Sequence, residues 1–271
     1  MIAEINEAVD FIKKNYSHKP DLGIVLGSGM GSFTDEMKIE KEIAYGDIPH
    51  FPVSTVEGHK GKLVFGEIAG KKVVAMAGRF HYYEGYSAEQ VVFPIRVMKF
   101  LGIETLLLSN AAGGVNPSFK VGDMMIITDH ISQLTPNPLV GMNYRELGPR
   151  FPDMSEPYKK HLIQKAKKIA AQKNIPVQEG VYVAVTGPTF ETLAEYKMIL
   201  AMGGDVVGMS TVQEVIAAVH MGLPVFAMSV VTDVGIREAG EPPVTHEEVL
   251  QAAKAAEPKF KALFCELIAQ L

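Results

Sequence analysis

The sequence has a single cysteine, no run of basic residues and no long apolar stretch. One cysteine, Cys265, excludes an internal disulfide and a zinc site built from several thiolates. The 26 Lys and Arg are outnumbered by 31 Asp and Glu, and this net charge of −5 disfavours nucleic acid and anionic membranes as partners. No apolar run approaches the roughly 20 residues that cross a bilayer, and residues 1–7 do not resemble a signal peptide. We therefore expect a cytoplasmic protein that binds neither nucleic acid nor membranes.

The chain alternates short apolar runs with longer segments of helical periodicity. The apolar runs predict strands that are buried on both faces, at residues 22–26, 72–77, 105–109, 124–128, 181–186 and 225–232. Helices are predicted at residues 2–14, 88–101, 158–172, 193–202, 212–221 and from 245 onwards. No linker, repeat or low-complexity segment divides the 271 residues. We predict one α/β domain over residues 1–271, with a central mixed, largely parallel sheet flanked by helices.

A glycine-rich segment, residues 27–32, follows the first predicted strand. Glycines at this point let the backbone approach an anion, and their N–H groups supply donors. The spacing does not match the dinucleotide fingerprint, because the third glycine comes one residue early, and the Walker sequence is absent. Ser28 between two glycines favours phosphate binding, and a plain tight turn is the alternative.

Two further segments carry candidate anion-binding side chains. Arg79 and His81 follow a predicted strand and would point the same way in an extended chain, so both could bind one anion. The alternative is a surface pair between Arg79 and Glu84. His59 lies outside any apolar pattern, so it is either a ligand-binding residue or an ordinary surface histidine. Asn110 begins a run of small residues that could form a ligand floor or a turn.

The last third of the chain adds three candidates. Phe190 could stack on a flat ring while Glu191 accepts a hydrogen bond from a ring N–H, although Glu191 could instead stabilise a helix N-terminus. Ser210 could be a helix N-cap with Gln213 as its partner, and its surroundings do not match the nucleophile elbow of hydrolases. His246 is not part of an H-E-x-x-H site, because position 250 is Leu, and we expect no metal.

The order of these motifs is more specific than any one of them. Between about residues 22 and 249 the chain resembles the trimeric purine nucleoside phosphorylase family, bacterial type, in the segments 27–29, 57–59, 78–85, 110–114, 150–155, 208–211 and 246–249. The resemblance implies the nucleoside phosphorylase fold and a homotrimer. It also implies that a purine nucleoside and inorganic phosphate give free purine and pentose 1-phosphate in purine salvage. Phosphate is then a co-substrate, and no cofactor is implied.

The resemblance also assigns roles to residues. It implies catalytic roles for His81, Glu191, Asp233 and His246. Phosphate would be held by Ser28, His59, Arg79, His81, Asn110, Ala111 and Ser210. Ribose would be held by Tyr83, Met209 and His246, with Phe151 supplied by a neighbouring subunit. The base would lie among Ala111, Gly113, Phe190, Glu191, Val207, Met209 and Asp233.

Asp233 departs from the family pattern, which usually has Asn there. An ionised Asp only accepts hydrogen bonds and would repel a 6-oxo oxygen, whereas a protonated Asp could donate to purine N7. Our hypothesis is that Asp233 broadens or shifts preference towards adenosine-type substrates, while Glu191 retains affinity for inosine and guanosine. The alternative is that Asp233 is turned away from the base and has no effect.

Three other functions compete with this interpretation. Methylthioadenosine phosphorylase is favoured by Asp233 and disfavoured by His246, because a buried imidazole facing a thioether would lose its hydrogen-bond partner. A nucleotide-dependent oxidoreductase is suggested only by the glycine-rich segment. A non-catalytic purine or phosphate binder would bind the same ligands without releasing base in a phosphate-dependent way.

Overall fold

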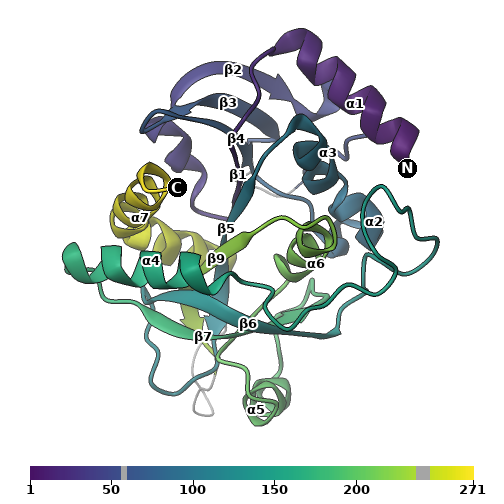
Figure 1. Cartoon of the computed structure of the whole chain (residues 1–271). Helices are drawn as coiled ribbons and strands as arrows, with labels where there is room; N and C mark the ends of the chain where they lie inside the picture. The colour runs from purple at the N-terminus through teal and green to yellow at the C-terminus, as the bar shows by residue number, and fades with distance from the viewer. Residues whose placement is uncertain (56–59, 236–244) are drawn as a thin grey trace.

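The computed structural model describes residues 1–55, 60–235 and 245–271. Its nine strands form one mixed sheet that helices cover on both sides (Figure 1). In spatial order the strands are β2 (Lys38–Ala44), β3 (Lys62–Ile68), β4 (Lys71–Ala77), β1 (Leu22–Leu26), β5 (Thr105–Gly114), β8 (Val206–Gly208), β7 (Gln178–Val185), β6 (Met124–Leu134) and β9 (Val225–Val234). Five strand pairings are parallel and four are antiparallel. The predicted fold class is confirmed.

The sheet closes on itself at one end. β5 pairs with β8 and also with β9. β8 in turn pairs with β7, β7 with β6, and β6 with β9. Five strands therefore form a ring. Two strands outside the ring, β4 and β1, run parallel to β5 and β9 of the ring. Their carboxyl ends meet at one edge, which is where open α/β sheets bind ligands.

Seven α-helices are described, and they differ from the prediction at one point. They are α1 (Ile2–Asn15), α2 (Ala88–Val91), α3 (Phe93–Leu101), α4 (Lys160–Gln172), α5 (Leu193–Ala201), α6 (Val212–His220) and α7 (His246–Ala269). The single helix predicted over 88–101 is two helices, because Pro94 cannot donate the backbone hydrogen bond that would continue α2. In the part of the chain described, no helix combines the length and apolarity needed to span a membrane.

Candidate active site

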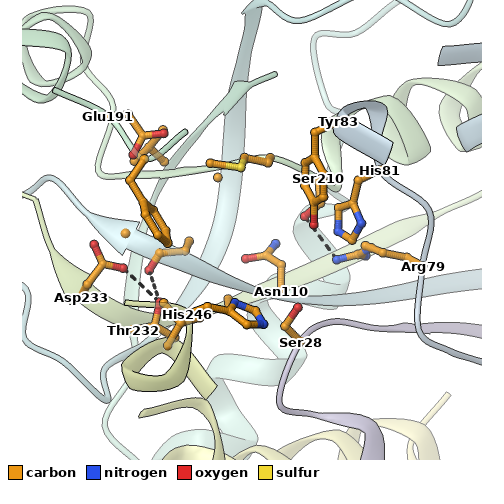
Figure 2. Close-up of a pocket in the computed structure, with 18 residues that line it drawn as sticks. Ser28, Arg79, His81, Tyr83, Asn110, Glu191, Ser210, Thr232, Asp233 and His246 are labelled. Atoms are coloured by element: carbon orange, nitrogen blue, oxygen red, sulfur yellow. Dashed lines mark hydrogen bonds between the residues drawn. The ribbon is translucent and has the colours of Figure 1, made fainter. Parts of the chain in front are cut away.

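A cavity opens where the parallel strands end (Figure 2). Most of the predicted site residues line it: Ser28, Arg79, His81, Tyr83, Asn110, Ala111, Gly113, Phe190, Glu191, Val207, Met209, Ser210, Asp233 and His246. Two do not. Phe151 lies outside this cavity, and His59 falls outside the described residues. The structure thus brings together groups that are far apart in the sequence.

Glycine allows the first strand to deliver Ser28 against β5. A Cβ on Gly27 would lie 2.8 Å from both the Asn110 Cα and the Ser109 carbonyl oxygen, closer than real contacts allow. The Gly27 N–H donates to the Ser109 hydroxyl at 3.2 Å, which fixes this close approach. The segment after β1 therefore serves as more than a turn, because it brings Ser28 to the cavity wall.

Arg79 lies just beyond β4 and is almost completely buried, with 1% of its surface exposed. Its Nε and Nη2 lie 3.2 and 3.0 Å from the two carboxylate oxygens of Glu214, which is also buried. Nη1 donates to the Ser109 carbonyl at 2.8 Å and lies 3.3 Å from the Ser210 hydroxyl oxygen. Burial raises the pKa of Glu214, while the charge of Arg79 opposes that shift. The alternative surface pair with Glu84 is wrong, because Glu214, which sequence reasoning missed, takes its place.

His81 is positioned by Glu84 instead. Glu84 Oε1 lies 3.0 Å from His81 Nδ1 and accepts the His81 N–H at 2.8 Å, and Oε2 accepts two hydrogen bonds from Thr55. Burial tends to raise the pKa of Glu84, but these hydrogen bonds outweigh it and lower the pKa to about 2. Burial and the charge of Arg79 lower the pKa of His81. A neutral His81 that donates from Nδ1 to an ionised Glu84 presents Nε2 as an acceptor.

Ser210 reaches the cavity through an unusual turn. Thr211 has φ +70° and ψ −55°, and the Val212 N–H bonds to the Ser210 carbonyl at 2.7 Å, so Thr211 is at the centre of the rare γ-turn with positive φ. Thr211 occupies the N-cap position of α6, and Gln213 donates to Thr135 and to the Pro136 carbonyl. The capping role considered for Ser210 is therefore wrong.

Asn110 and Glu191 also differ from their simpler interpretations. β5 extends to Gly114, so Asn110 lies within the strand rather than in a turn, and it donates to the Thr211 hydroxyl at 2.9 Å. Glu191 precedes Thr192, the N-cap of α5, so it is not in the first helical turn. Both side chains face the cavity (Figure 2).

The far end of the cavity carries two carboxyl groups. A register shift between β5 and β9 pairs Asp233 with Gly113, and a Cβ on Gly113 would lie only 3.0 Å from the Asp233 carboxylate. Asp233 also accepts a hydrogen bond from the Thr232 hydroxyl at 3.2 Å. Burial raises the pKa of Glu191, and the charge of Asp233 raises it further. Asp233 is thus on the cavity wall and is not turned away from it (Figure 2).

Phe151 is the most exposed large apolar side chain described, at 88%. It belongs to an arm, which we define as residues 135–152, between β6 and α4. Arg150 donates to the Leu139 and Gly141 carbonyls, and the His220 ring at the end of α6 lies 3.0 Å from the Pro149 carbonyl oxygen. Hydrogen bonds within the chain therefore hold the arm in place, while the Phe151 side chain remains exposed.

Glu84 gives a testable pH dependence of stability. Its folded pKa of about 2 lies below the value of about 4.3 expected in the unfolded chain. It therefore stabilises the fold above that unfolded value, and the contribution disappears as pH falls towards 2. We expect Glu84→Gln to be less stable than wild type at pH 7 and the difference to shrink by pH 3, as measured by urea unfolding. The exposed Glu146→Gln variant is the control, and a difference that does not change with pH would contradict this role.

Comparisons with known proteins agree with this geometry. A model of the Phosphorylase superfamily matches residues 21–269. Purine nucleoside phosphorylase 1 of Bacillus subtilis is 51% identical over 98% of this chain and 98% of its own, and that of Geobacillus stearothermophilus is 53% identical over 94% and 93%. The crystal structure of Schistosoma mansoni purine nucleoside phosphorylase in complex with adenosine superposes with a TM-score of 0.95 at 43% identity, covering 100% of this chain and 98% of that one. The chain belongs to the purine nucleoside phosphorylase family.

Proposed function

We propose that this protein cleaves purine ribonucleosides and deoxyribonucleosides with inorganic phosphate, releasing the free purine and the pentose 1-phosphate. One observation carries the proposal. A single cavity has anion-binding groups at one end, including Ser28, Arg79 and Ser210, and an aromatic ring with two carboxyl groups at the other. Relatives of about half-identical sequence are named purine nucleoside phosphorylases, and the Schistosoma structures contain inosine or guanosine. Phosphate is the co-substrate, and we propose no cofactor.

The phosphate end supplies both donors and an acceptor. Arg79 and the hydroxyl groups of Ser28 and Ser210 donate to phosphate oxygens. Neutral His81 accepts a hydrogen bond from the one protonated oxygen of a phosphate dianion. Asn110 and the backbone of Ala111 complete the floor beneath the sugar. These groups are held before phosphate arrives, so little reorganisation is needed during the reaction.

The sugar lies between the two ends of the cavity. Tyr83 stacks on His81 with ring centroids 4.6 Å apart. Met209, the residue before Ser210, also lines the cavity. His246 begins α7 and faces the cavity, where it would bond the 5′-hydroxyl. The 5′-hydroxyl can donate a hydrogen bond to this imidazole or accept one from it, whereas a thioether cannot donate. The site therefore favours ordinary nucleosides over methylthioadenosine.

The chemistry follows from where charge develops. Breaking the bond from C1′ to N9 leaves positive charge on the sugar and negative charge on the purine. A phosphate dianion held next to C1′ stabilises the sugar cation and attacks it, forming the new C–O bond while the electron pair of the broken bond leaves with the base. Positioning and preorganised electrostatics can supply most of the acceleration, so no covalent enzyme intermediate is required.

The base is held by Phe190, Val207 and the two carboxyl groups. Phe190 offers a stacking face, and Glu191 accepts a hydrogen bond from a ring N–H, as inosine and guanosine present. Asp233 adds a second carboxyl group, and an ionised carboxylate accepts hydrogen bonds from a 6-amino group. We therefore include adenosine among the substrates.

The phosphate requirement tests the function itself. We expect purified protein to release hypoxanthine from inosine only when phosphate is present, with one sugar phosphate formed per base released. The measurement is free base by chromatography with and without phosphate. Release that ignores phosphate would indicate a hydrolase, and binding without release would indicate a purine-binding protein.

Asp233→Asn tests base selection. We expect the ratio of kcat/KM for adenosine to that for inosine to fall about tenfold or more, because a hydrogen bond to a charged acceptor is lost and an amide can donate to a 6-oxo group. The exposed Asp47→Asn variant serves as control. The hypothesis is wrong if wild type does not cleave adenosine or if the ratio is the same in both proteins.

We further propose a homotrimer in which Phe151 completes the site of a neighbouring subunit. Two separate apolar surfaces support this. The arm exposes Val140, Met142 and Phe151, and α5 with its approach exposes Phe190, Leu193, Met198, Leu200 and Met202. The arm lies at the right of Figure 1 and α5 at the bottom, so the two surfaces are separate. Contact between unlike surfaces forms a ring when the rotation between subunits closes. Phe190 belongs both to the α5 surface and to the cavity, so an arm docked there would reach the nucleoside.

Phe151→Ala tests this arrangement. We expect the KM for inosine to rise about tenfold or more, because a buried aromatic contact is lost, while the KM for phosphate changes little. Mixed assemblies of Phe151→Ala subunits with Arg79→Gln subunits should recover wild-type affinity at the sites that receive an intact Phe151. No recovery on mixing, or an unchanged KM in the variant, would contradict the proposal.

Both products remain usable for synthesis, since cleavage by phosphate yields a sugar phosphate rather than a free sugar. We accordingly propose a role in purine salvage, and we place this step in the cytoplasm, where nucleosides and inorganic phosphate are both available.

A further inference from the structure

Glu214 is buried beside the phosphate end of the cavity but does not line it. It is the third residue of α6, and both of its carboxylate oxygens face the guanidinium of Arg79 at 3.2 and 3.0 Å. The two side chains are exposed by only 2% and 1%. Such a pair needs a reason, because replacing a buried ion pair with apolar groups often leaves a protein as stable or more so.

The pair fixes the direction of Arg79. Glu214 engages the Nε and Nη2 edge of the planar guanidinium, and the Ser109 carbonyl accepts from Nη1 at 2.8 Å. Two anchors on a rigid fork leave one orientation. In that orientation Nη1 lies 3.3 Å from the Ser210 hydroxyl oxygen, on the cavity side (Figure 2).

The pair also changes the charge that an incoming anion meets. An uncompensated arginine in a buried site would attract a phosphate dianion strongly, and it would hold the sugar phosphate product equally well. Glu214 offsets one positive charge at a point that the anion does not touch. Phosphate then binds chiefly through oriented hydrogen bonds, and both anions can leave.

We propose that Glu214 is a positioning residue that aims Arg79 and weakens anion binding, so that phosphate and the sugar phosphate product exchange during turnover. This inference rests on the proposed function. It assigns Glu214 an effect of a particular sign, since removing its charge should tighten phosphate binding, whereas structural damage would loosen it.

Glu214→Gln keeps the shape of the side chain and removes its charge. We expect the Kd for inorganic phosphate, measured by calorimetry, to fall about tenfold, and the KM for phosphate to fall with it. We expect kcat to fall because the sugar phosphate leaves more slowly. Glu104→Gln, in an exposed pair with Lys19, is the matched control and should equal wild type.

Glu214→Asp separates the effect of the charge from the effect on the orientation of Arg79. It retains the charge and shortens the side chain by one methylene group, so phosphate affinity should stay within about twofold of wild type while kcat falls about tenfold, because Arg79 is less well oriented. If Glu214→Gln does not fold, this variant still tests the positioning of Arg79 through kcat. Unchanged or weaker phosphate binding in Glu214→Gln, or a wild-type kcat in Glu214→Asp, would overturn the proposal. Base release that needs no phosphate would instead overturn the proposed function.

Discussion

The buried ion pair between Arg79 and Glu214 holds the site together. It joins the end of β4 to the start of α6, and Arg79 also bonds the backbone of β5 through the Ser109 carbonyl. Removing one partner of such a pair leaves a buried charge and destabilises a protein by about 3–5 kcal/mol. Three segments distant in sequence are therefore tied at one point, and the anion end of the cavity forms around it.

One end of the cavity is rich in hydrogen-bond donors and the other in carboxyl groups. Hydrogen-bond donors gather at the end with Arg79 and Ser210, while carboxyl groups from Glu191 and Asp233 gather at the end with Phe190. A nucleoside and phosphate would span this gradient with the anion beneath the sugar and the N–H edge of the base towards the carboxyl groups. The fold makes this possible because parallel strands deliver one side chain or loop each to the same edge.

Much of this arrangement could be predicted from the sequence. The buried strands at β1 and β4 were predicted within one residue, and the small residues after Asn110 indicated a ligand floor. β2 was missed because it is largely exposed and charged, β8 because it has only three residues, and β3 because Gly66 and Glu67 interrupt its apolar run. Short or polar strands lack the continuous apolar signal on which such predictions depend.

The contacts within the site were harder to predict than its members. Glu214 reads as an ordinary acidic residue in a first helical turn, and its partner Arg79 lies 135 positions away. The local sequence favours Ser210 as a helix N-cap, because no neighbouring residue indicates the positive φ of Thr211. Pairings of this kind are decided by tertiary packing, so the sequence supplied candidates and the structure supplied their partners.

In the proposed reaction, phosphate held beside Arg79 is itself the nucleophile. The most direct measurement is to cleave inosine in phosphate labelled with ¹⁸O at all four oxygens and to determine the mass of the sugar phosphate formed. We expect all four labelled oxygens to be retained, because a phosphate oxygen forms the bond to C1′. A product with only three labelled oxygens and an unlabelled oxygen on C1′ would contradict it, since water would then have attacked C1′ and a P–O bond of phosphate would have broken when the sugar was phosphorylated.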